Sequence, residues 1–383
     1  MDFIALKMLV GDRLKYLSLV AGLSFAALLV IQQASIFTGY ALQTGAWVRD
    51  SSVADLWVMD EQVEFTDDIK PMIDTALQRV RGVEGVQWAV PMYKSYLNAI
   101  LPDGTRKNVR VVGIDDATLT AGPPEMVQGT VADLRRDRSV IINIADARGS
   151  LAMGKGDNTV PLRVGDRMSI NDNEVEIVGT YNATPEFFWE PVIYTTFSRA
   201  VFMAPRERRT LMYTLVKVRE GENLAVVQQR IGEIPGLKAL TNKQFEDETM
   251  WWILEKTGIL INFGITIALG FVIGVLVAGQ TLYTFILENI RQFAALKAMG
   301  ATHAMLVRMV FVQVVVAGVM GWGLGLGGAS LTGSAFSKIG LAFSMPWQVP
   351  VLGGGAILIC CLVAGVLSLH KVFSTEPAIV FKA

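Results

Sequence analysis

Aspartate, glutamate, lysine, arginine and histidine are absent from four long apolar segments of this 383-residue chain, which lie at 17–37, 258–286, 309–331 and 349–369. Each segment is long enough to cross a hydrocarbon core of about 30 Å, which takes about 20 helical residues. Transporters driven by protons or ions usually keep an ionisable group within the membrane, because a charge there is costly and persists where it works. The absence disfavours an ion-driven transporter and predicts that energy for work arrives from another subunit.

Cysteine and histidine are also scarce, with two of each in the chain. Cys360 and Cys361 are adjacent inside the last apolar segment, where they offer neither a fold-stapling disulfide nor metal-ligand spacing. Both histidines fall on the side predicted to be cytoplasmic, so no extracytoplasmic zinc site or Ser-His-Asp triad can be built. We therefore predict no catalytic residue and no metal site.

A nucleotide-binding loop is missing as well. The Walker A pattern, G-x4-G-K-[ST], needs serine or threonine directly after its lysine. The nearest match, Gly-Lys-Gly at 154–156, has glycine at that position instead. The chain is therefore not expected to bind a cofactor or to be an enzyme.

Charge is low, and its distribution predicts a topology. Charged residues make up 18% of the chain against about 25% in soluble domains, and the net charge of −1 disfavours nucleic acid as a partner. Lysine and arginine gather before the first segment and in the 287–308 connection, whereas the 332–348 loop has only Lys338. The positive-inside rule then places both termini and the 287–308 connection in the cytoplasm. We expect a multi-pass protein of the bacterial inner (plasma) membrane, embedded in the lipid bilayer.

The first segment has a second interpretation. Small residues follow it and leave open a cleaved signal peptide, but its run of about 21 apolar residues exceeds the 7–15 of an ordinary signal sequence. An uncleaved anchor is favoured. Residues 1–16 mix apolar and charged side chains and predict an interfacial helix on the inner leaflet, and 370–383 form a cytoplasmic tail.

The expected fold is a membrane protein with four transmembrane helices in a 1+3 arrangement and a large α+β extracytoplasmic domain at 38–257. Alternating apolar residues predict strands in that domain, and Pro-Asp-Gly-Thr at 102–105 and Asn-Asp-Asn at 171–173 predict turns. A helix is expected at 67–81, and a stalk helix at 242–257 is expected to lead straight into the second segment. The strands are expected at 86–90, 95–101, 109–114, 140–143, 167–170, 175–181, 213–218 and 238–240.

Glycine pairs at four-residue spacing occur in the second and third segments, Gly270 with Gly274 and Gly321 with Gly325. This spacing permits close helix–helix approach. A dimer interface and packing within one chain are equally compatible with it.

The 287–308 connection is longer and more apolar than a simple turn. Glu288 and Arg291 share one helical face, and Phe293, Leu296 and Met299 form an apolar stripe. Gly300 suits the position just after a helix, and Thr302 suits the cap of the next one. An amphipathic helix is predicted there, with a docking surface for a cytoplasmic partner.

The residues from Glu288 to Thr302, read as E-N-I-R-Q-F-A-A-L-K-A-M-G-A-T, resemble the signature of FtsX-like, MacB-type ABC transporter permeases. The tail Ser-Thr-Glu-Pro-Ala at 374–378 is similar to that family's closing element, and the 1+3 layout matches too. Within the family, the 6–33 region most resembles the permease of heterocyst-type (DevC-like) exporters.

The resemblance implies a permease that works with a separate cytoplasmic ABC ATPase dimer, which would bind ATP and Mg²⁺. It also implies a second permease copy, identical or paralogous, with a periplasmic adaptor (membrane fusion protein) and an outer-membrane channel as further partners. The residues expected to couple to the ATPase are Glu288, Arg291, Phe293, Leu296, Lys297, Met299 and Gly300.

Three functions remain open from the sequence. The first is export or extrusion of an amphipathic substrate by mechanotransmission, meaning that ATP-driven motion passes to the outer domain. The second is an FtsX-like transducer that regulates an envelope hydrolase or sensor without moving substrate. A receptor without an ATPase is the third, and it leaves the amphipathic helix unexplained. The size of the outer domain favours the exporter.

Overall fold

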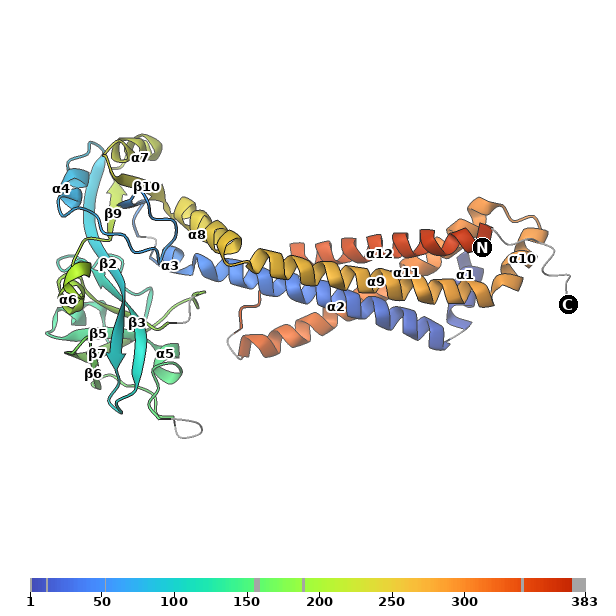
Figure 1. Ribbon diagram of the computed structural model, residues 1–383, viewed down its shortest axis with the longest axis horizontal. Coiled ribbons are helices and arrows are strands. Elements are labelled where there is room, and N and C mark those ends of the chain that lie inside the picture. The colour runs from blue at the N-terminus through green and yellow to red at the C-terminus, as the bar shows by residue number, and fades with distance from the viewer. Residues whose placement is uncertain are drawn as a thin grey trace. The chain divides into compact units, whose positions relative to one another are not determined.

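The computed structural model describes residues 2–11, 13–51, 53–154, 159–187, 190–338 and 341–373. The chain divides into two compact units, one made of residues 1–41 and 257–383 and the other of Leu42–Lys256 (Figure 1). The first unit is helical. It contains α1 (Asp2–Gly11), most of α2 (Arg13–Thr44), α9 (Ile259–Glu288), α10 (Ile290–Ala298), α11 (His303–Lys338) and α12 (Gln348–Phe373).

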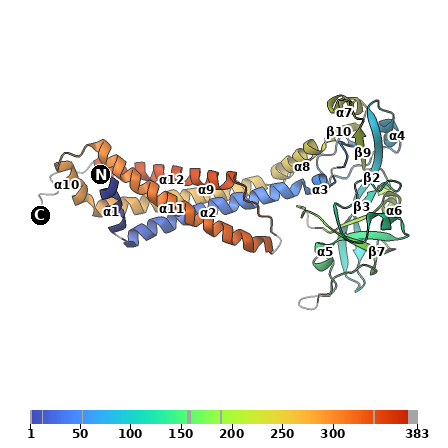
Figure 2. The same cartoon turned by 180° about the vertical axis from the view of Figure 1, so that it is seen from behind.

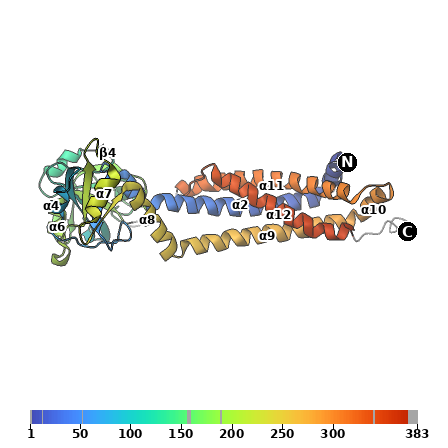
Figure 3. The same cartoon turned by 90° about the horizontal axis from the view of Figure 1, so that it is seen from above.

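Four of these helices are long and apolar enough to span a membrane, at Arg13–Thr44, Ile259–Glu288, His303–Phe336 and Gln348–Val366. Each predicted segment overlaps one of them, and only residue 258 and residues 367–369 of the predicted segments fall outside these spans, so the 1+3 fold class is confirmed. The helices run past the predicted ends because polar residues at their termini also keep helical backbone. Figure 3 shows α9 running beside α12, which it contacts.

The core of the helical unit forms mainly around α2. Leu23, Ala27 and Ile31 are fully buried there, together with Met309 and Ala317 of α11. Helix α9 differs, because only 11% of its most apolar window is buried, against 39% for α2. Most of the apolar surface of α9 therefore faces outward from this unit.

Helix α1 packs against α11. Its Ala5 and Leu9 are buried, and the Gln313 side chain of α11 donates a hydrogen bond to the Ala5 carbonyl at 2.8 Å. The sequence predicted only contact with the lipid surface at 1–16. The difference arises because an isolated amphipathic pattern does not show which neighbour receives its apolar face.

The second unit contains a split βαβ fold. Its sheet has the order β10-β1-β9-β2, with helices α4 and α7 packed on one face through a shared apolar cluster. The elements are β1 (Leu56–Asp60), α4 (Ala76–Arg81), β2 (Val86–Ile100), β9 (Tyr213–Val218), α7 (Leu224–Gly232) and β10 (Leu237–Thr241). The other face meets α3 (Ala46–Asp50) and α8 (Asn242–Lys256) through Trp47, Trp57 and Phe245.

Between β2 and β9 the chain builds a closed circuit of strands, of which β2, β3 and β7 are labelled in Figure 2. Neighbours pair in the order β2-β3-β8-β5-β7, and β6 closes the circuit by pairing with both β7 and β2. The short strand β4 pairs with β7 alongside β6. The remaining elements are β3 (Arg106–Ile114), β4 (Glu125–Gln128), η1 (Val131–Arg135), β5 (Ser139–Asn143), α5 (Ile144–Arg148), β6 (Arg167–Ile170), β7 (Asn173–Asn182), β8 (Val192–Thr196), α6 (Phe197–Met203) and η3 (Arg206–Arg208).

The predicted hairpin turns are present. Asn171 and Asp172 have φ angles of 44° and 63°, the left-handed pair that a type I′ turn requires. Gly104, with φ 83°, closes the turn between β2 and β3 by donating to the Leu101 carbonyl at 2.9 Å.

Three sequence expectations were wrong. The helix expected at 67–81 is limited to Ala76–Arg81, because Asp67 is drawn into a buried ionic cluster described below. The strands expected at 86–90 and 95–101 form one continuous strand, β2. The stalk helix does not continue straight on: α8 ends at Lys256, and Gly258, with φ 69°, separates it from α9.

Candidate functional site

The connection between α9 and α11 carries the residues that the sequence singled out. Helix α9 ends at Glu288, and the Asn289 side chain donates to the Phe285 carbonyl at 2.9 Å while its own carbonyl accepts from the Phe293 N–H at 3.1 Å. The chain thus bends at one residue and starts α10 at once. This arrangement holds α10 as a separate short helix.

Helix α10 ends in a Schellman motif. The Gly300 N–H donates to the Lys297 carbonyl at 3.1 Å, and the Ala301 N–H donates to the Leu296 carbonyl at 3.0 Å. Gly300 has a φ of 95°, which side-chain-bearing residues rarely adopt, and a Cβ there would meet nothing within 4 Å. Position 300 therefore favours glycine because of its backbone conformation and not because a neighbouring atom lies too close.

The apolar stripe of α10 is divided between the interior and the surface. Phe293 and Leu296 are 2% and 8% exposed and belong to the core of the helical unit, whereas Met299 is 76% exposed. The sequence expected all three on a docking surface. Phe293 and Leu296 anchor the helix instead, and the exposed positions are Gln292 and Ala298 of α10 and the C-cap residue Met299.

Glu288 forms an ion pair with Lys15 in the first turn of α2. The carboxylate side chain is 52% exposed, so the pair contributes less than about 1 kcal/mol to stability. The ion pair joins the end of α9 to the beginning of α2.

The other predicted coupling residues are described only in part. Lys297 is half-buried, and the side chain of Arg291 lies outside the described residues, as does the tail element at 374–381.

All four glycines of the predicted packing motifs lie against α2. A Cβ at Gly270 would be 3.3 Å from the Leu29 Cβ, and one at Gly274 would be 2.8 Å from the Ala26 Cβ. The contacts at the other two glycines are closer: a Cβ at Gly321 would be 2.6 Å from the Leu23 Cβ, and one at Gly325 would be 2.5 Å from the Ala27 Cβ. Packing within one chain accounts for these glycines.

Replacing Gly325 by alanine is expected to destabilise the helical unit by about 1–3 kcal/mol, because the new methyl would overlap α2, including the Ser24 carbonyl oxygen at 2.7 Å. Gly327, two residues further on, has nothing within 4 Å of its Cβ position, so Gly327→Ala is the matched control and should be neutral. Thermal unfolding of both variants in detergent tests this. Equal melting temperatures would contradict the packing described.

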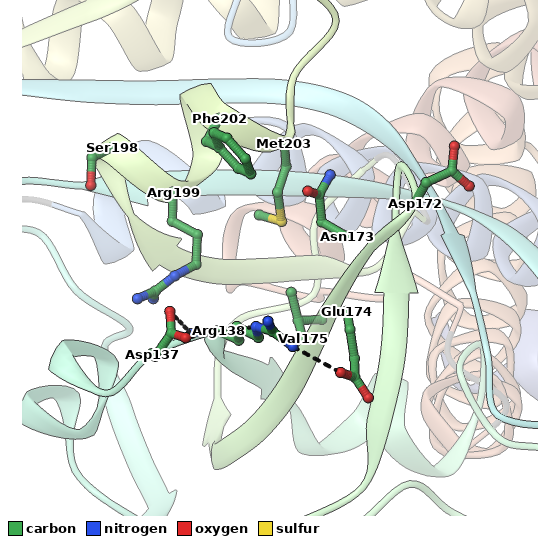
Figure 4. Close-up of a pocket in the computed structure, with 10 residues that line it drawn as sticks. All are labelled: Asp137, Arg138, Asp172, Asn173, Glu174, Val175, Ser198, Arg199, Phe202 and Met203. Atoms are coloured by element: carbon green, nitrogen blue, oxygen red, sulfur yellow. Dashed lines mark hydrogen bonds and ion pairs between the residues drawn. The ribbon is translucent and has the colours of Figure 1, made fainter.

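A cavity of ≈ 770 Å³ opens in the outer unit between the start of β7 and α6 (Figure 4). Its two arginines are engaged locally: Arg138 pairs with Glu174 at 3.0 Å, and Arg199 donates to the carbonyls of Ser139 and Arg136 at 3.2 and 2.9 Å. Within the described parts of the chain, no three His, Cys, Asp or Glu residues are grouped so as to hold a metal ion.

A buried ionic cluster lies on the outer unit's strands β2 and β3. Lys94 Nζ is 2.8 Å from the Asp67 carboxylate and 3.8 Å from the centre of the Trp47 ring, and Arg110 pairs with Glu186. Lys94 and Arg110 are each 1% exposed, and Asp67 is 4% exposed. Burial alone would raise the pKa of Asp67, but the two cations hold that pKa below its usual value. The cluster fixes α3, through Trp47, to the strands.

Sequence reasoning missed several of these residues. Lys15, Gln313 and the partners of Asp67 are distant from each other in the chain, and each pair forms only in the folded protein. A lysine and an arginine at strand positions facing apolar neighbours were the available signal for the buried cluster.

Comparison with known proteins gives two matching family models. The MacB-like periplasmic core domain matches residues 17–234, more than half of the chain, and the FtsX-like permease C-terminal domain matches residues 264–377. Together they cover most of the outer unit and most of the helical unit.

Three solved structures are similar to about half of the chain. The periplasmic region of MacB from Actinobacillus actinomycetemcomitans is 11% identical, with 52% of this chain and 94% of that chain covered and a TM-score of 0.37. The extracellular domain of the noncanonic ABC-type transporter YknZ from Gram-positive bacteria is 13% identical, with 49% and 99% of the two chains covered and a TM-score of 0.34. A domain of a putative permease protein from Porphyromonas gingivalis is 15% identical, with 50% and 89% of the two chains covered and a TM-score of 0.33.

The family models decide the assignment, and they confirm the family that the 288–302 signature indicated. The DevC-like subtype stays a prediction. The chain belongs to the MacB-like, FtsX-like family of ABC-transporter permeases, which implies an ABC ATPase partner and a multi-pass location in the membrane.

Proposed function

We propose that this chain is the permease subunit that receives motion from a separate cytoplasmic ATPase dimer and passes it to the outer unit. The work done is export or extrusion of an amphipathic substrate. ATP and Mg²⁺ bind in the partner, and the permease provides no catalytic group. Both termini and α10 lie on the cytoplasmic side in this proposal, as the distribution of lysine and arginine indicates.

The observation that carries the proposal is the construction of α10. Two buried side chains, Phe293 and Leu296, attach the helix to the core of the membrane unit, and the Schellman motif at Gly300 fixes its end. A helix held in this way moves with the core when its exposed face is pushed. Met299 then supplies the apolar contact to the ATPase, with Arg291 and Lys297 on the same short helix and Glu288 at the end of α9.

A second permease copy is part of the proposal. Helix α9 leaves most of its apolar surface outside the unit, and residues such as Leu269, Val272 and Leu276 point outward from it. This surface suits either lipid or a second copy, identical or paralogous. A periplasmic adaptor and an outer-membrane channel complete the proposed assembly in a Gram-negative envelope.

The FtsX-like transducer remains the alternative function, because it needs the same α10 contact and the same outer unit. The two differ in their further partners. Recovery of an adaptor and an outer-membrane channel with the permease supports export, and recovery of an envelope hydrolase supports the transducer.

An affinity pull-down from native membranes tests the coupling contact. The wild-type chain is expected to recover an ATPase with a Walker A motif, and Met299→Ala is expected to recover at least fivefold less, because truncating a buried interface anchor costs about 1 kcal/mol or more. The matched control is Met320→Ala, which alters an exposed methionine in the middle of α11. Equal recovery with both variants would show that Met299 does not contact the ATPase.

A further inference from the structure

A small cavity of ≈ 360 Å³ in the outer unit lies where the short strand β4 ends beside β7. Gln128 of β4 and Ile142 of β5 both pair with Thr180 of β7, so Thr180 lies in the middle of three neighbouring strands. Helix α5 and the segment 161–164 complete the lining. The cavity is therefore lined by four separate pieces of the chain: β4, α5, the 161–164 segment and β7.

The hydroxyl of Thr180 has no hydrogen-bond partner in the described structure, although this residue is 3% exposed and lines the cavity. Burying a hydroxyl without a partner costs about 1–3 kcal/mol, and such groups are rare in folded proteins. A ligand that accepts a hydrogen bond from Thr180 would remove that cost.

Two arginines also line the cavity, Arg148 at the end of α5 and Arg163 on the 161–164 segment. Neither side chain has an ion-pair or hydrogen-bond partner among the described residues. No carboxylate among the described residues lines the cavity; Asp166 accepts the backbone N–H of Arg163 at 2.7 Å but is not part of the lining. The lining therefore combines two exposed, positively charged arginines with a buried threonine hydroxyl that has no partner among the described residues. Arginine and hydroxyl donors are the groups that bind an oxyanion.

The rest of the lining is largely apolar and includes Ile144, Leu162 and Val164. The volume is near the lower end of the 300–1,000 Å³ that small-molecule sites occupy. We propose that this cavity binds a small organic carboxylate whose short aliphatic body contacts these side chains while Arg148, Arg163 and Thr180 hold the carboxylate. Inorganic phosphate would fill the charged part and leave the apolar part uncovered.

Isothermal titration of the full-length chain in detergent with hexanoate, acetate and inorganic phosphate tests the proposal. Hexanoate is expected to bind saturably and more tightly than acetate or phosphate. Arg163→Gln should weaken hexanoate binding at least tenfold, because it removes a charge-assisted hydrogen bond. Thr180→Val should weaken it about fivefold or more without lowering the melting temperature, since the lost hydroxyl has no partner within the protein.

Matched controls are available. Thr214 of β9 is also fully buried with an unpartnered hydroxyl but lies outside this cavity, so Thr214→Val should leave binding unchanged. Arg219→Gln removes an exposed arginine elsewhere in the unit and should also leave hexanoate binding unchanged. The proposal is overturned if hexanoate does not bind, if phosphate binds more tightly than hexanoate, or if the cavity variants bind as the controls do.

Discussion

Replacing Gly300 by valine is expected to reduce ATP-driven transport at least tenfold while leaving the outer unit folded. The φ of 95° at this position is open to glycine and strained by roughly 1–3 kcal/mol for a β-branched residue. Valine would therefore break the Schellman bonds from Gly300 and Ala301 and unwind the end of α10. Met299, one residue away, would lose its fixed position against the ATPase.

The measurement is ATPase activity and transport of the reconstituted complex, together with tryptophan fluorescence as a monitor of the outer unit. Gly300→Asn is the matched control, because asparagine tolerates left-handed backbone better than other side-chain-bearing residues, and it should retain much of the activity. Normal coupling in the valine variant would show that the end of α10 does not transmit motion.

Replacing Arg110 by methionine is expected to destabilise the outer unit by about 3–5 kcal/mol. The change leaves Glu186 without its cationic partner and removes one of the two cations that face Asp67 in a site shielded from water. Removing one partner of a buried ion pair is costly because the remaining charge stays desolvated. Denaturant unfolding of the full-length chain, followed by tryptophan fluorescence, measures the loss.

An exposed ion pair supplies the control. Arg138 pairs with Glu174, and their side chains are 62% and 49% exposed, so Arg138→Met should cost less than about 1 kcal/mol. If the two methionine variants unfold at the same denaturant concentration, the buried cluster does not stabilise the outer unit.

The Asp67 carboxyl adds a dependence on pH. Its folded pKa lies below the ordinary value of 3.8, so its contribution to stability is present above that value and is lost as pH falls through the folded pKa. Acid unfolding of the wild-type chain should therefore include a step below about pH 4, and Asp67→Asn should lack this step.

The sequence predicted the features that are encoded locally. The four spans follow from uninterrupted apolar runs, and the end of α10 follows from a glycine after an amphipathic helix. Turns at 102–105 and 171–173 follow from residues that favour left-handed backbone. These features depend on neighbouring residues alone, so no knowledge of tertiary contacts is needed.

The sequence could not predict which partners distant segments choose. The sequence placed Phe293 and Leu296 on an exposed stripe, whereas both belong to the core of the helical unit. Periodicity shows that one face of a helix is apolar, but it does not show what covers that face. The segment at 67–75 read as helix because its composition allows a helix, whereas pairing of Asp67 with Lys94 fixes it in another conformation. Likewise, the Gly270 and Gly321 motifs left dimer and internal packing open until α2 was seen beside them.

Photo-crosslinking from α10 tests the central claim most directly. A diazirine-bearing lysine analogue placed at Met299 is expected to crosslink to the ABC ATPase in native membranes, and the same group at Leu331 of α11, which is 75% exposed, is expected not to. Crosslinking of the ATPase at position 299 alone would establish α10 as the surface that receives its motion. Absence of an ATPase adduct at position 299 in an assembled, active complex would contradict the account.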